Sequence, residues 1–255
     1  LLKNGNPILR HSHRTALSCP SDPDMAEPIV SISNLSFAWT PGNEVLDISD
    51  FQLKAGERLF LRGASGSGKS TLLGIIAGVL EAGSGEVIVL GQDLATLEPA
   101  ARDRLRADHL GVIFQMFNLV PYLSVIGNVT LPLRFSPKRR AAINGNEDDE
   151  ARRLLSRLGL TDETLLARRV SDLSVGQQQR VAAARALIGG PEIVIADEPT
   201  SALDADARDQ FIDLLSEEAR RTGAALLFVS HDAGLATHFD RAVDLGEINR
   251  AGVSA

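Results

Sequence analysis

Hydrophobic and polar residues alternate where the chain first shows a regular pattern. Polar and apolar positions alternate through residues 29–34, and a second strand-like run covers residues 45–53. Such alternation predicts strands with one buried face. Turns at Gly42 and Gly56 separate these runs from a third, residues 58–62. Three strands joined by short turns predict an antiparallel sheet at the N-terminus.

The rest of the chain alternates between helical patterns and short apolar runs. The apolar runs are typical of buried strands in an α/β fold, and they cover residues 110–114, 193–196 and 224–229. Residues 125–173 contain helical patterns without a strand signal, which predicts a helical insertion. The last patterned segment, residues 242–248, predicts a closing hairpin.

Composition bounds the class of protein. With 255 residues, 44% of them hydrophobic, the chain can form one domain or one domain with a subdomain. A net charge of -7 argues against a protein that binds nucleic acid by broad phosphate neutralisation. The single cysteine, Cys19, cannot form an intramolecular disulfide and favours a reducing compartment. The chain has no apolar stretch of roughly 20 residues, the length that a membrane helix needs.

The first 24 residues differ from the rest. They have no periodic pattern, contain many polar residues and begin with Leu1. We interpret residues 1–24 as a disordered leader or a cloning remnant, and we expect the folded domain to cover residues 25–255.

Residues 63–71 carry the clearest chemistry. They lie between an apolar strand pattern and a helical pattern and match the phosphate-loop motif, a glycine, four residues, then Gly-Lys-Ser/Thr. Such a loop directs backbone N–H groups and a helix N-terminus at phosphate, whereas a flexible Gly/Ser turn would lack the flanking strand and helix. The candidate nucleotide-binding residues of the loop are Gly63, Ala64, Ser65, Gly66, Ser67, Gly68, Lys69, Ser70 and Thr71. In this motif Lys69 reaches the β- and γ-phosphates, and Ser70 binds Mg²⁺.

Three later apolar runs end in polar residues. Gln115 follows the first, Asp197 and Glu198 follow the second, and His231 follows the third. In α/β folds the carboxyl ends of parallel strands carry ligand-binding groups. Asp197 is the candidate partner of the Mg²⁺ ion, and Glu198, which should face another direction, can polarise an attacking water. A lone histidine at such a place is more often structural.

Two further features have open interpretations. Ser174 is placed to cap the helix through residues 181–187, and a capped helix start can bind an anion or simply be a well-formed terminus. Trp39, beside a polar turn, can stack on a base or pack against its own domain. The apolar loop 117–122 can be a contact surface or pack internally.

The order of these elements resembles the ATP-binding subunit of ABC transporters. The order is Trp39, the phosphate loop, Gln115, the Leu-Ser-Val-Gly-Gln segment 173–177, the Asp-Glu pair and the histidine, and the resemblance covers about residues 29–248. Residues 114–121 further resemble the subgroup of LolD-like, MacB-like and FtsE-like ATPases. Val175 stands where the family usually has Gly and Trp39 where Tyr is usual; we expect activity to survive both departures.

The resemblance implies a fold, a cofactor pair and a dimer. The fold is a P-loop NTPase (RecA-like) core with an N-terminal antiparallel β subdomain and an α-helical subdomain inserted at about residues 116–180. The cofactors are ATP and Mg²⁺, and two subunits close head to tail around two ATP molecules. The residues that this implies at the dimer seam are Ser174, Gly176, Gln177 and Asp204.

The resemblance also implies roles for individual residues. Trp39 would stack on adenine, Gln115 contact Mg²⁺ and the attacking water, Glu198 act as general base and His231 touch the γ-phosphate.

The implied partner is an integral membrane permease, with this chain bound peripherally at the cytoplasmic face of the inner membrane. An FtsE-like ATPase that drives a membrane partner without transport is the alternative. A soluble ABC ATPase acting on DNA or ribosomes is disfavoured, because the chain has one cassette and no long heptad run. We therefore expect no nucleic-acid partner.

Overall fold

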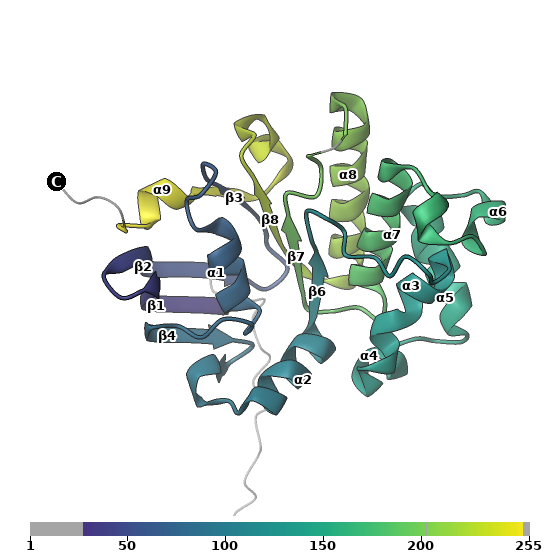
Figure 1. Cartoon of the computed structure of the whole chain (residues 1–255). Helices are drawn as coiled ribbons and strands as arrows, with labels where there is room; N and C mark the ends of the chain where they lie inside the picture. The colour runs from purple at the N-terminus through teal and green to yellow at the C-terminus, as the bar shows by residue number, and fades with distance from the viewer. Residues whose placement is uncertain (1–27, 202, 252–255) are drawn as a thin grey trace, which may run out of the picture.

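The computed structural model describes residues 28–201 and 203–251, which form two sheets with helices between and beside them (Figure 1). The predicted leader, residues 1–24, lies outside the described residues. The first sheet has four antiparallel strands in the order β2-β1-β4-β5. Its strands are β1 (Pro28–Thr40), β2 (Asn43–Lys54), β4 (Ser84–Val89) and β5 (Gln92–Asp93).

The second sheet has five parallel strands in the order β6-β7-β8-β3-β9. Its strands are β3 (Arg58–Arg62), β6 (Leu110–Ile113), β7 (Ile193–Asp197), β8 (Ala225–Ser230) and β9 (Arg241–Asp244). The prediction that residues 58–62 form the third strand of the antiparallel sheet was therefore wrong. Leu59, Phe60 and Leu61 are all buried, so β3 needs cover on both faces and lies inside the parallel sheet.

Alternate side chains of the parallel strands enter two separate cores. Leu59 and Leu61 of β3 pack in the core between the two sheets, whereas Phe60 packs in the core on the opposite face. In β7, Ile195 belongs to the first core and Val194 to the second. The period of two along each strand thus divides the molecule into two hydrophobic layers on either side of one sheet.

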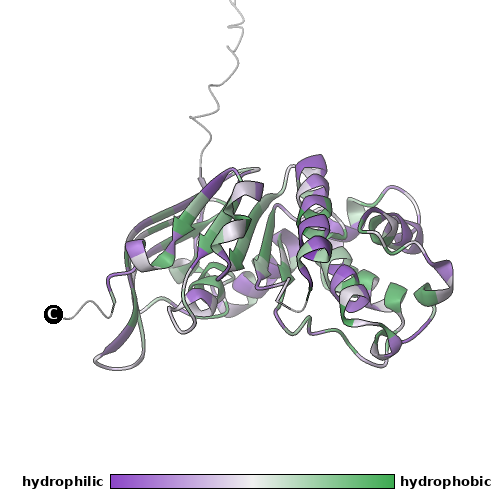
Figure 2. Cartoon of the chain, turned by 90° about the horizontal axis from the view of Figure 1, so that it is seen from above, coloured by the Kyte–Doolittle hydropathy of each residue, from purple (hydrophilic) through white to green (hydrophobic). Residues whose placement is uncertain are grey.

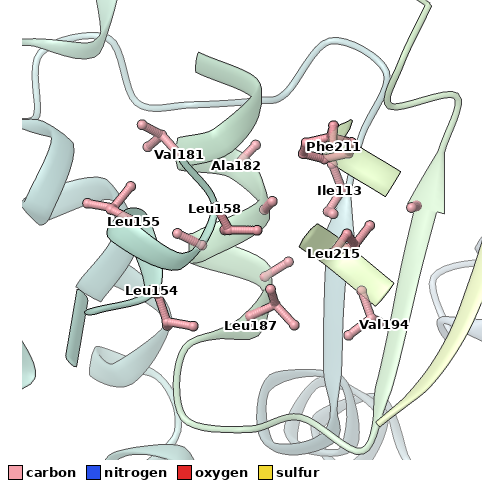
Figure 3. Close-up of a cluster of buried hydrophobic side chains, with 14 of the residues drawn as sticks. Ile113, Leu154, Leu155, Leu158, Val181, Ala182, Leu187, Val194, Phe211 and Leu215 are labelled. Carbon is pink, nitrogen blue, oxygen red and sulfur yellow. The ribbon is translucent and has the colours of Figure 1, made fainter. Parts of the chain in front are cut away.

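Helix α1 (Lys69–Ile76) lies between the sheets, where it contacts β2, β4 and β7. The opposite face of the parallel sheet is covered by helices whose leucines meet on α7 (Figure 3). The other α-helices are α2 (Pro99–His109), α3 (Val125–Thr130), α4 (Pro137–Ala141), α5 (Glu147–Arg157), α6 (Glu163–Leu166), α7 (Val175–Leu187), α8 (Ala205–Thr222) and α9 (Leu245–Ile248). The 3-10 helices of the described residues are η2 (Leu94–Thr96), η3 (Leu131–Arg134), η4 (Val170–Asp172) and η5 (Ala233–His238).

The chain does not end in the predicted hairpin. β9 pairs in parallel with β3, and α9 follows it directly. Asp244 accepts a hydrogen bond from the Gly246 N–H and caps this helix, while Leu245 is fully buried. An Asp cap next to a buried leucine favours a helical turn over a returning strand.

The helices from α3 to α6 follow β6 in sequence and carry the helical pattern that was predicted for residues 125–173. In Figure 2 the central strands are largely hydrophobic in colour, whereas the antiparallel strands and the helices mix hydrophilic and hydrophobic residues. Within residues 28–201 and 203–251 no helix combines the length and the hydrophobicity needed to cross a bilayer.

A buried arginine joins the helical segment, which comprises α3 to α6, to the end of α7. Arg139 of α4 is 3% exposed, and burial lowers the pKa of its guanidinium to about 10. Its Nε donates to the Ile188 carbonyl at 2.8 Å, and its Nη2 donates to the Ala186 carbonyl at 2.7 Å. The cation is therefore held by the carbonyls at the end of α7.

We expect Arg139→Leu to lower the free energy of unfolding by roughly 2–4 kcal/mol, because buried carbonyls lose their donors. Chemical denaturation monitored by circular dichroism measures the change. The matched control is Arg140→Leu, since Arg140 is exposed and pairs with Glu147 at the surface, where such pairs contribute about 0–1 kcal/mol. Equal effects of the two substitutions would contradict the role of Arg139.

Candidate functional site

The loop between β3 and α1 has the backbone that a phosphate cradle requires. Gly66 and Gly68 have φ of 78° and 96°, in the left-handed region that glycine adopts readily. A Cβ on Gly68 would lie 2.8 Å from the Leu46 side chain, so only glycine fits there. The Ser67 N–H donates to the Ala64 carbonyl at 3.2 Å and tightens the loop.

Lys69, the first residue of α1, is 7% exposed. Its Nζ donates to the carbonyls of Gly63 and Ala64, both at 2.8 Å. The same Nζ lies 3.5 Å from Oε1 of Glu198. The ammonium is thus satisfied by the loop itself and by a carboxylate from β7's end.

Ser70 and Asp197 meet across the sheet edge. The Ser70 hydroxyl donates to Oδ2 of Asp197 at 3.0 Å. Burial raises the pKa of Asp197 above its ordinary value; the Glu198 charge adds to this rise, and the Ser70 hydrogen bond opposes it. A desolvated carboxylate beside a hydroxyl is a pair of hard oxygen donors of the kind that Mg²⁺ prefers.

Glu198 lies just beyond β7, where the backbone changes direction. Its φ is 43°, and its N–H donates to the Val229 carbonyl at 3.0 Å. Oε2 of Glu198 lies 3.1 Å from Nδ1 of His231, which follows β8 and is 63% exposed. Asp197 and Glu198 therefore contact different partners, and the left-handed turn at Glu198 contributes to this separation.

The structure places the other candidates in different surroundings. Trp39 is 62% exposed, with one ring edge against Phe37 at a centroid distance of 5.1 Å. Gln115 is exposed in a turn after β6. Asp204 caps α8 by accepting from the Ala207 N–H at 2.9 Å.

The N-terminus of α7 is closed by a capping box. The Gln177 N–H donates to the Ser174 hydroxyl, and the Ser174 N–H donates to the Gln177 side chain at 2.9 Å. Val175 and Ser174 are exposed. Among the residues that the structure describes, no hydrogen bond or ion pair joins this helix start to Lys69, Ser70 or the carboxylates.

The apolar loop after Gln115 has both exposed and internally packed residues, so each of its two interpretations applies to part of it. Met116 and Tyr122 are exposed, whereas Phe117 and Leu119 pack against the core that the helical segment shares with the parallel sheet.

One residue that supports the loop has no signal in the sequence. Asn249 donates from Nδ2 to the carbonyls of Val45 at 2.9 Å and Ser67 at 3.3 Å. It therefore ties the phosphate loop to β2 from the far end of the chain. A single asparagine after a short helical segment carries no pattern by which this contact can be recognised.

The assembled donors fit a phosphate chain with a divalent cation. The loop exposes backbone N–H groups beside a helix N-terminus, and the buried Ser67 hydroxyl has no hydrogen-bond partner in the described part of the protein. No group of three or more His, Cys, Asp or Glu side chains is arranged to hold a metal within the described ranges. A Mg²⁺ ion here would thus rely on Ser70, Asp197 and oxygens from the nucleotide.

A strand, a glycine-rich loop with a buried lysine, and a parallel strand ending in aspartate define a phosphate-loop nucleotide hydrolase. The profile of the family described as "ABC transporter" matches residues 46–201. The chain belongs to this family, and it is an ATPase. The resemblance and the α/β phosphate-loop fold expected from the sequence are confirmed.

The relatives agree in class and differ in length. The ABC transporter ATP-binding protein Rv0986 of Mycobacterium tuberculosis is 41% identical over 86% of this chain and 87% of its own length. The ABC transporter ATP-binding protein YbbA of Escherichia coli is 41% identical over 86% of this chain and 95% of its own. The macrolide export protein MacB 2 of Aeromonas hydrophila is 38% identical over 87% of this chain, which spans only 34% of that protein.

Solved structures show the same fold. The ATP-binding cassette MJ0796, solved as a dimer in a post-hydrolysis state bound to ADP and Pi, is similar with a TM-score of 0.76 and 35% identity, covering 84% of this chain and 93% of that one. A second dimeric structure of MJ0796 has a TM-score of 0.74.

We expect Asp197→Asn to raise the melting temperature by a few degrees without nucleotide or Mg²⁺, because it removes a desolvated charge. About 1 kcal/mol corresponds to roughly 2–4 °C in a domain of this size. The raised pKa means that the folded state holds this proton more tightly than the unfolded state. The stability that protonated Asp197 contributes is therefore lost as pH rises through the carboxyl range. The Asn variant should not show this decrease in melting temperature.

Calorimetry between pH 4 and pH 8 checks both statements, with the exposed Asp50→Asn as the control. A variant that melts below the parent at pH 7 would contradict them.

Proposed function

We propose that the chain is the ATP-hydrolysing subunit of an ABC transporter, working as a head-to-tail homodimer that drives a separate integral membrane permease from the cytoplasmic face of the inner membrane. The supporting observation is an incomplete site. Lys69, Ser70, Asp197, Glu198 and His231 are linked by direct contacts within one subunit. The capped start of α7 lies apart from them and can serve a second copy.

In this proposal α7 completes the partner's site. The two chains in dimeric cassette structures that are 32–35% identical to this one provide a precedent for pairing. Ser174, Gly176 and Gln177 would direct the helix N-terminus at the γ-phosphate held by the partner's loop, and Asp204 would lie at the seam. This pairing accounts for a capped helix start that lies apart from the phosphate loop of its own subunit.

Within each subunit the phosphate loop, residues 63–71, would bind the phosphates, and the exposed face of Trp39 would stack on adenine. Ser70, Asp197 and Gln115 would hold Mg²⁺, directly or through water. Mg²⁺ supplies charge neutralisation between the β- and γ-phosphates.

Glu198 would act as the general base. Its carboxylate lies between Lys69 and His231, so it is held in place before a substrate arrives. Lys69 would then stabilise the charge of the β- and γ-phosphates, and His231 would contact the γ-phosphate. Glu198 would accept a proton from the attacking water. Because phosphoryl transfer depends on positioning and charge, separated subunits with half of each site should hydrolyse slowly.

A groove beside the Gln115 turn provides a surface for the membrane partner. It has a volume of about 430 Å³ and is lined by residues of α2, β6, η3 and α7. Its apolar lining includes Phe114, Leu131, Pro132 and Phe135, the last 70% exposed. We propose that an apolar segment of the permease packs here, where it contacts both the helical segment and the Gln115 turn.

We expect Glu198→Gln to lower ATP turnover roughly 100-fold or more, since a general base contributes on that order. ATP binding should persist, and the dimer should accumulate with ATP. Phosphate release, quenching of Trp39 fluorescence and size-exclusion chromatography measure these three properties. Lys69→Ala is the contrasting variant, because it should weaken nucleotide binding itself. Turnover at the parent rate by Glu198→Gln would refute the assignment of Glu198.

We expect Phe135→Ser to abolish recovery of an integral membrane partner while leaving the ATPase rate of the isolated chain within twofold. The test is affinity purification of the full chain from detergent-solubilised membranes of its own source, followed by identification of the multi-span protein recovered. Val79→Ser, an exposed apolar residue outside the groove, is the control. Equal recovery by the parent and Phe135→Ser would remove the groove from the proposal, and recovery of ribosomes or DNA in place of a membrane protein would overturn the transport role.

A further inference from the structure

Two consecutive residues of the loop after β6 have left-handed backbones. Phe117 and Asn118 have φ of 57° and 48°. Asparagine tolerates this region, whereas a bulky residue such as Phe117 is strained there. Such a backbone persists only where surrounding contacts hold it in place.

The contact that holds it comes from α7. Nη2 of Arg185 donates to the Phe117 carbonyl at 2.6 Å, and Nη1 donates to the Asn118 carbonyl at 2.7 Å. The planar guanidinium therefore donates one hydrogen bond to each of the two strained residues. Arginine can do this with its fork of N–H groups, whereas lysine cannot.

The surroundings of Arg185 make these two carbonyls its main partners. The side chain is half-buried, and burial alone lowers the pKa of its guanidinium. No carboxylate forms an ion pair with it among the described residues. A desolvated cation without a carboxylate gains its stabilisation from the carbonyl oxygens, which makes the contact with the loop specific.

The same loop residue closes the turn that carries Gln115. The Phe117 N–H donates to the Phe114 carbonyl at 2.9 Å, so Gln115 and Met116 are the central residues of this turn. Arg185 therefore holds the residue whose other hydrogen bond shapes the backbone at Gln115.

Arg185 and the capping box lie on one helix. Ser174 precedes the first residue of α7, and Arg185 lies near the other end of the helix, about 16 Å from Ser174 at the rise of an α-helix. Helix α7 therefore connects the capped start directly to the contact with the Gln115 turn.

We infer that Arg185 is a positioning residue that fixes the Gln115 turn to α7, so that engagement of the α7 N-terminus in one site changes the placement of Gln115 in the other site of the dimer. This inference rests on the roles proposed above for Gln115 and the α7 N-terminus.

The test is a double-mutant cycle between Arg185→Gln and Gln115→Ala in the full chain. Arg185→Gln should lower kcat roughly tenfold while the ATP dissociation constant from Trp39 quenching changes less than twofold. In the Gln115→Ala background the same substitution should lower kcat by less than about twofold, because residues acting through one another are not additive. Arg185→Lys, which keeps the charge and loses the fork, should recover only part of the rate.

Arg180→Gln is the matched control. Arg180 also lies on α7 and donates to carbonyls, those of Leu158 at 2.8 Å and Gly176 at 3.2 Å, without touching the loop. It therefore controls for the loss of an α7 arginine that does not hold the Gln115 turn.

Hydrogen exchange supplies a readout that does not depend on activity. Amides of residues 114–118 should exchange at least several-fold faster in Arg185→Gln and Arg185→Lys, and at the parent rate in Arg180→Gln. Multiplicative effects of Arg185→Gln and Gln115→Ala, or unchanged exchange in this segment, would overturn the inference while leaving the ATPase assignment intact. A parent chain that hydrolyses no ATP would instead refute the proposed function, and this inference, which rests on it, would fall with it.

Discussion

The buried ammonium of Lys69 is the interaction on which the arrangement of this protein depends. A cation with 7% of its surface exposed must be satisfied, and here the carbonyls of Gly63 and Ala64 and the Glu198 carboxylate do so. This requires the ends of β3 and β7 to meet at one edge, which only a parallel sheet with β8 between them provides. The two hydrophobic layers, divided by alternation along the same strands, pack on both faces of the sheet that carries this edge.

Sequence patterns predicted what is determined locally. The strand and helix that flank residues 63–71, the Ser174 cap and the helices after β6 form as predicted, because each depends on residues a few positions apart. The prediction for residues 58–62 was wrong because a short preceding turn is compatible with either sheet. The unbroken apolar run of this strand, which needs cover on both faces, places it in the parallel sheet. The hairpin at the C-terminus was wrong because Asp244 was not recognised as a helix cap.

Other features of the site depend on contacts that no local pattern encodes. Asn249 reaches the Ser67 carbonyl from 182 positions away, and Arg185 reaches the Phe117 carbonyl from 68 positions away. The left-handed backbone of Glu198 follows from its N–H bonding to the neighbouring strand β8, so it too could not be predicted from the order of residues. These side chains were unpredictable because the fold, rather than the motif, brings their partners to them.

The helical segment, α3 to α6, is joined to α7 and α8 by contacts of two physical kinds. Their shared interior is one apolar cluster in which leucines of α5 face α7, and such contacts resist separation but specify direction weakly (Figure 3). Directional contacts lie at the margins, where Arg139 holds the end of α7 and Arg153 of α5 donates at 2.9 Å to the buried Glu218 of α8. The helical segment is therefore held mainly by apolar packing, and its few polar contacts fix its direction relative to α7 and α8. Helix α7 takes part in both kinds of contact. Its apolar face packs in the shared interior, the carbonyls at its end accept hydrogen bonds from Arg139, and its capped start is exposed.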